Sequence, residues 1–154
     1  MEREKVINYL KGYYYAGREI RQITEELQAI SYEFGLKSPA LSGMPSGSCD
    51  GSDLSRYIIR VETIQRQLEE KREKQVMRMG SISDVISTLS DPEERLILRY
   101  RYLILDHGRL QTWERIADNC YMSRITVIRI HERAIQNLIR NDTIECDNVQ
   151  ADKR

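Results

Sequence analysis

The chain has 154 residues, which is enough for one ordinary hydrophobic core or two small ones. Charged residues make up 31% of it and hydrophobic residues 40%, with few glycines and prolines, and this composition predicts an all-α fold. Lys plus Arg and Asp plus Glu both number 24, so nucleic-acid binding cannot be argued from net charge and must rest on local charge placement.

Cysteine usage and hydropathy argue against several kinds of site. Cys49, Cys120 and Cys146 are far apart, odd in number and without close histidines, so we expect neither a disulfide framework nor a zinc site. No apolar run approaches the roughly 18 residues that cross a bilayer, and the N-terminus leads into no signal-peptide core. We therefore expect a cytoplasmic protein with no membrane contact, no metal and no cofactor.

Two segments of the N-terminal part carry apolar residues at heptad spacing. The first set is Val6, Tyr9, Tyr13, Ala16, Ile20, Ile23, Leu27, Ile30 and Phe34. The second follows Asp53, a good N-cap, and is Leu54, Tyr57, Val61, Ile64 and Leu68. Residues 1–89 are predicted to form a long antiparallel, coiled-coil-like helical hairpin.

Residues 35–53 separate the two heptad segments. They read GLKSPALSGMPSGSCDGSD and show no periodic pattern, so they are predicted to be a linker. The linker either connects antiparallel helices or orders on a partner. The second helix is expected to continue through the charged stretch 69–75, with a break near Gly80 as the open alternative.

A separate unit is predicted over residues 90–140. Ser90 or Asp91, followed by Pro92 and acidic residues, is typical of a helix start. The first helix is expected to carry Leu96, Ile97, Tyr100 and Leu103 inward and Arg95, Arg99 and Arg101 outward. It ends in a turn at 106–109, and the polar residues 141–154 form a fraying tail.

Two further helices complete the predicted unit. A short helix follows Thr112 as its cap, with Trp113, Ile116 and Ala117 as its buried side. Cys120–Met122 form a tight turn, and Ser123 caps the last helix. The apolar stripe of that helix is Val127, Ile130, Ala134, Ile135 and Leu138.

The order of these parts is that of a helix-turn-helix. Ala117 is the small residue at the crossing of the two helices, and the last helix would enter the major groove with its N-terminal residues. Arginine can reach guanine or phosphate, and an apolar side chain can touch a thymine methyl group. The predicted DNA-contacting residues of this helix and its cap are Ser123, Arg124, Ile125, Thr126, Ile128, Arg129, His131 and Arg133.

The strings LSDPEERLILRYRY, TWERIA and MSRITVIRIHERAIQNL resemble region four of bacterial sigma factors. They resemble more closely the ArpU- and RinA-type phage regulators of late genes. The resemblance covers roughly the last third of the chain and implies a regulator of phage or prophage promoters in a bacterial host cell. It also implies that Thr112 contacts the DNA near its backbone. Ile125 and Ile128 depart from the sigma pattern, which has charged residues there, so the usual sigma promoter element is not expected as the target.

The sequence therefore predicts a non-enzymatic transcription regulator that binds double-stranded DNA. The N-terminal helices would serve dimerisation or contact with RNA polymerase. Their heptads could pair within the chain or across a two-fold axis with a second copy, and a homodimer is expected. One alternative is a DNA-packaging protein resembling a small terminase subunit, and another is a module that binds polymerase or another regulator. His131 is expected to be an exposed helix residue, because no catalytic group accompanies it.

Overall fold

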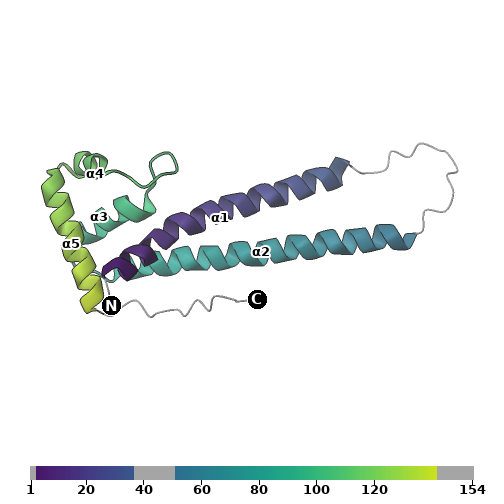
Figure 1. Cartoon of the computed structure of the whole chain (residues 1–154), viewed down its shortest axis with the longest axis horizontal. Coiled ribbons are helices and arrows are strands. Elements are labelled where there is room, and N and C mark those ends of the chain that lie inside the picture. Colours follow the sequence, from purple (N-terminus) through teal and green to yellow (C-terminus); the bar gives the residue numbers. More distant parts are fainter. Residues whose placement is uncertain (1–2, 37–50, 142–154) are drawn as a thin grey trace. The chain divides into compact units, whose positions relative to one another are not determined.

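The described part of the chain is helical (Figure 1). The computed structural model describes residues 3–36 and 51–141, and no strand occurs within these two ranges, which confirms the predicted all-α class. The elements are α1 (Arg3–Leu36), α2 (Gly51–Ser87), α3 (Pro92–Leu98), the π-helical turn η1 (Arg99–Leu103), α4 (Trp113–Cys120) and α5 (Arg124–Arg140). None of the described helices is long and apolar enough to span a membrane.

Several sequence predictions fall outside the described residues. They concern most of the linker, the polar tail, Cys49, Cys146 and the side chains of Phe34 and Leu54.

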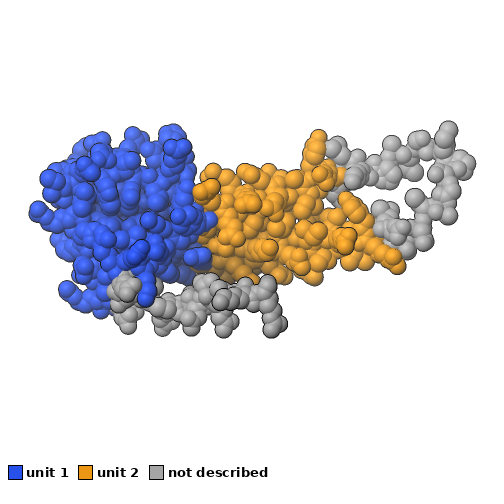
Figure 2. Space-filling model, viewed as in Figure 1, with its two compact units in different colours: residues 1–15, 78–154 blue, residues 16–77 orange. Residues whose placement is uncertain are grey.

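The chain forms two compact units, drawn in blue and orange in Figure 2. Unit 1 comprises residues 1–15 and 78–154, and unit 2 comprises residues 16–77. This division differs from the predicted boundary between residues 89 and 90. The physical reason is that both ends of the predicted hairpin contribute side chains to a core that also contains α5.

The larger core of unit 1 joins segments that are far apart in sequence. Val6 and Leu10 of α1 pack in it with Ile86 of α2 and with Ile135 and Leu138 of α5. All five side chains are almost completely buried. At about 25 cal/mol per Å² of apolar surface, burial on this scale makes the first turns of α1 part of the folded unit.

A second core lies under α3, α4 and α5. Ile97, Ile116, Ala117, Val127 and Ile130 form it, as the apolar pattern of residues 112–138 predicts. Ala117 is small enough to lie in this core, where α4 packs on α5.

The first helix of the predicted C-terminal unit agrees with our expectation at Ile97, which is buried, and at Arg99, which is exposed. Leu96, predicted to point inward, is 42% exposed, because α3 buries Glu94, Ile97 and Leu98 on its other side. Arg101, predicted to point outward, lies with its guanidinium carbon 4.4 Å from the ring centroid of Trp113. The wider π-turn of η1 shifts the side-chain register after Leu98, which a pattern based on 3.6 residues per turn does not anticipate.

Unit 2 consists of the remaining parts of α1 and α2. Ala16, Ile23 and Leu68 are its buried hydrophobic residues, and all three belong to the predicted heptads. The helix α2 is continuous through the charged stretch 69–75 and through Gly80, so the alternative of a break at Gly80 is wrong. Propensity alone disfavours glycine in a helix by about 1 kcal/mol, and neighbouring turns and packing outweigh this cost.

Candidate nucleic-acid interface

Side-chain caps fix the starts of α4 and α5. The hydroxyl oxygen of Thr112 accepts a hydrogen bond from the backbone N–H of Arg115 at 3.3 Å. The hydroxyl oxygen of Ser123 accepts one from the N–H of Thr126 at 3.2 Å. The hydroxyls of Ser123 and Thr126 also bond to each other at 2.8 Å. Both predicted caps are confirmed, and all three exposed hydroxyl groups lie at helix starts.

The turn between the two helices is tight. Tyr121 adopts the left-handed conformation, with φ 54° and ψ 40°, and the N–H of Met122 donates to the carbonyl of Ala117 at 3.0 Å. This hydrogen bond satisfies a carbonyl group at the end of α4. The predicted turn at Cys120–Met122 is therefore present, and it leaves the side chain of Tyr121 97% exposed.

One face of α5 is buried along most of its length. It carries Val127, Ile130, His131, Ala134, Ile135 and Leu138. Five of these six residues form the predicted apolar stripe, and the sixth, His131, does not.

The opposite face of α5 is open to solvent at its N-terminal end. Ile125 is 70% exposed, and Arg129, four residues later, is also exposed. Arg129 makes no hydrogen bond or ion pair with any residue in the described ranges. Ile128 is half-buried. Ile125 and Arg129 are one helical turn apart, so they present an apolar and a cationic group side by side.

The other arginines predicted to contact DNA are engaged within the chain. The Nε atom of Arg124 lies 3.0 Å from a carboxylate oxygen of Glu114 at the start of α4, although both side chains are more than half exposed. The Nε atom of Arg133 donates to Glu94 at 2.6 Å, and the same guanidinium also pairs with Asp91. The hydrogen bond to Glu94 raises the pKa of Arg133.

Glu94 is an acidic residue that the sequence analysis did not single out. It is 1% exposed, and its carboxylate also accepts two hydrogen bonds from the side-chain amide of Asn137, at 2.9 and 3.0 Å. This network joins α3 to α5 and gives Arg133 a structural role. The only sequence signal was the spacing of Arg133 and Asn137, which puts both on one face of a helix.

His131 contradicts its predicted exposure, since only 3% of it is accessible. A hydrogen bond of 2.9 Å joins its Nε2 atom to the hydroxyl of Tyr102, and the edge of its ring meets Trp113 at a centroid distance of 4.9 Å. It lies four residues after Val127 and three before Ala134, so the helical period places it in the buried stripe. His131 is therefore removed from the candidate interface.

Burial also changes the proton affinity of this pair. Loss of hydration lowers the pKa of His131 to about 4 and raises the pKa of Tyr102 to about 12. Both side chains are therefore neutral near pH 7. Their position and charge fit a packed polar contact of the core.

The positive charge that α5 presents is smaller than its own sequence indicates, in which Arg124, Arg129, Arg133 and Arg140 stand against one acidic residue. Glu132, the one acidic residue in α5, bonds to Arg3 of α1, and this contact lowers the pKa of Glu132. Carboxylates from α3 and α4 neutralise Arg133 and Arg124, as described above. Because these partners lie on other elements, the charge balance could not be read from α5 alone.

No group of three or more potential metal ligands occurs among the described residues. Comparison of the chain with protein-family models, with curated proteins and with solved structures gave no match.

Proposed function

We propose that the chain binds duplex DNA as a transcription regulator of the phage or prophage type. In this proposal α4 and α5 act as a helix-turn-helix, α5 enters the major groove, and α1 and α2 form the antiparallel hairpin expected from the heptads. The fit of capped helices, a tight turn and a small residue at the crossing supports the helix-turn-helix assignment.

The observation that carries the proposal is the exposed Arg129, one turn after the exposed Ile125 and without a partner among the described residues. A guanidinium in such a position can bind guanine or phosphate with no ion pair to break. Ile125 can contact a thymine methyl group, and the half-buried Ile128 supports its position. Arg124 can join them by exchanging Glu114 for a phosphate, because that pair is exposed and weak.

The direct test measures binding of the full chain to duplex DNA by fluorescence anisotropy across a range of salt concentrations. Arg129→Ala is expected to weaken specific binding by about 1 to 3 kcal/mol if Arg129 reads a base. If Arg129 holds a phosphate, the variant reduces the salt slope by about one. The target duplex would first be selected from a random pool.

Arg140→Ala is the matched control. It removes the same charge from an exposed position on the same helix, but 11 residues further from the turn. Equal losses for the two variants would mean that only net charge matters. Unchanged affinity and salt slope for Arg129→Ala would remove α5 from the interface.

A protein-binding module is the second candidate, favoured by two exposed apolar side chains at the turn. Tyr121 is 97% and Ile125 is 70% exposed, and clustered apolar residues on a surface are typical of protein interfaces. RNA polymerase or another regulator would be the partner. Undetectable duplex binding at low salt, together with binding to polymerase that Tyr121→Ser abolishes, would favour this candidate.

A further inference from the structure

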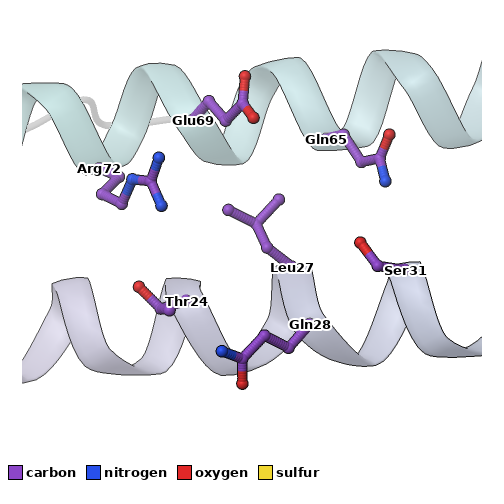
Figure 3. Close-up of a pocket in the computed structure, with 7 residues that line it drawn as sticks. All are labelled: Thr24, Leu27, Gln28, Ser31, Gln65, Glu69 and Arg72. Carbon is purple, nitrogen blue, oxygen red and sulfur yellow. The ribbon is translucent and has the colours of Figure 1, made fainter.

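The two helices of unit 2 border two chemically different hollows. One is a polar groove of about 480 Å³, to which Thr24, Gln28 and Ser31 of α1 and Gln65, Glu69 and Arg72 of α2 contribute (Figure 3). Leu27 is the one apolar residue that lines this groove. Such a surface is compatible with water.

The second hollow of unit 2, here named the apolar depression, has a volume of about 210 Å³. It is lined by Ile30, Glu33, Tyr57, Arg60, Val61 and Ile64. These residues lie nearer the end of α1 at Leu36 and the start of α2 at Gly51 than those of the polar groove.

Heptad residues in the apolar depression are only partly covered within the chain. Tyr57 and Ile64 are each 41% exposed, although they occupy the same heptad seam as Leu68, which is 9% exposed. Large apolar side chains left in water at seam positions are stabilised when another helix surface covers them. The polar groove has no comparable exposed hydrophobic residue.

The charges beside the depression indicate what covers it. Glu33 comes from α1 and Arg60 from α2, both are exposed, and neither makes an ion pair with another described residue. In a two-fold symmetric contact each surface meets its own copy, so residue i contacts j and j contacts i. One carboxylate and one guanidinium beside the same apolar floor are self-complementary under this rotation.

We infer that the apolar depression packs against the same depression of a second copy of this chain, giving an antiparallel four-helix interface. Tyr57 and Ile64 supply its apolar centre, and Glu33 of each copy faces Arg60 of the other. The inference deepens the proposed function, because a two-fold axis would match a palindromic operator. This link to DNA rests on the proposed function.

Sedimentation equilibrium of the full chain tests the interface. The wild type is expected at twice the chain mass of 18.1 kDa. Ile64→Glu buries a carboxylate at the apolar centre and should raise the dimer dissociation constant about 100-fold or more. Its matched control, Gln65→Glu, adds the same charge one residue away in the polar groove and should leave the dimer intact. Circular dichroism checks that both variants keep their helices.

Exchanging the charges of Glu33 and Arg60 tests the interface independently, even if Ile64→Glu disturbs the fold of the chain. Glu33→Arg alone and Arg60→Glu alone each bring like charges together and should weaken the dimer about tenfold. The double variant restores both opposite-charge pairs and should recover wild-type association.

Three outcomes would overturn the inference. The first is a monomeric wild type, and the second is a ring of many copies. The third is a dimer whose dissociation constant changes equally with Ile64→Glu and Gln65→Glu, or changes with neither. Failure of DNA binding is distinguishable, because it is measured separately and through Arg129. If the wild type dimerises and Ile64→Glu abolishes the dimer, the inferred interface is supported even when no DNA binding is found. If the wild type is a monomer that binds a half-site of DNA, the proposed function is supported and the interface is not.

Discussion

Two buried polar residues of unit 1, Glu94 and His131, show how much a single side chain depends on its partners. Glu94 accepts three hydrogen bonds, whereas His131 has one and its Nδ1 atom has no hydrogen-bond partner among the described residues, although it lies 3.7 Å from a carboxylate oxygen of Glu132. A fully bonded buried carboxylate joins helices, while an incompletely bonded imidazole is held neutral by its surroundings.

His131 predicts a pH dependence of folding. Its pKa falls from 6.5 in the unfolded chain to about 4 in the folded one, so the unfolded chain binds more protons between these values. The contribution to stability is complete above pH 6.5 and is lost as the pH falls toward 4. The expected loss is about 3 kcal/mol, and urea unfolding at several pH values measures it.

The chain contains its own control for this prediction, since it has two histidines. His131→Gln keeps a polar side chain but cannot titrate, so it should flatten the profile. His107→Asn changes an exposed turn residue with φ 49° and should leave the profile as in the wild type. Carboxylates also titrate in acid, and the difference between the two variants removes their effect. A profile unchanged in His131→Gln would show that the folded imidazole takes up protons freely.

At the scale of the elements, α2 contains a glycine that its surroundings do not require. A Cβ atom added at Gly80 would meet nothing within 4 Å, and the residue is exposed. Gly80→Ala should therefore stabilise the chain by about 1 kcal/mol, because alanine restricts the unfolded backbone and favours the helix. The midpoint of urea unfolding reports the change.

Gly12→Ala provides the contrast within α1. There the added Cβ would lie 3.0 Å from the Nη2 atom of Arg78, so the guanidinium must move. We expect a smaller gain than at Gly80, since displacement of Arg78 offsets part of the helix preference. Destabilisation by Gly80→Ala would instead mean that α2 bends or opens at residue 80 in solution.

At the scale of the whole molecule, unit 1 makes the N-terminus part of the proposed DNA-binding module. Leu10 of α1 packs in one core with Ile135 and Leu138 of α5, more than 120 residues later in the chain. Leu10→Ala should destabilise the fold by about 2 to 5 kcal/mol and speed amide exchange in α5. Hydrogen exchange followed by mass spectrometry resolves this effect peptide by peptide.

Asn8→Ala is the matched control on an exposed position of the same turn of α1. It should stay within about 0.5 kcal/mol of the wild type and leave exchange in α5 unchanged. If Leu10→Ala speeds exchange in α1 alone, α5 is stable without the N-terminal turns, and residues 90–140 form an independent domain after all.

The sequence was most informative where a signal lies within one helix. The caps Thr112 and Ser123, the turn before Ser123 and the apolar stripe of α5 were all predicted, because hydrogen bonds to a helix start and a 3.6-residue period are local. The same applies to the continuous α2 and to the buried heptad positions Ala16, Ile23 and Leu68. Such features need no knowledge of which element packs on which.

Only the tertiary structure decided which polar side chains are engaged in hydrogen bonds and ion pairs with other described residues. The partners of Arg133, Glu132 and Arg124 come from α3, α1 and α4, so no pattern in α5 could tell these engaged side chains from Arg129, which has no partner within the described ranges. The burial of Glu94, Ile97 and Leu98 on one face of α3 left Leu96 exposed, and the aromatic surroundings of His131 made a histidine part of the core. Helix formation depends on neighbours in sequence, whereas burial and ion pairing depend on neighbours in space.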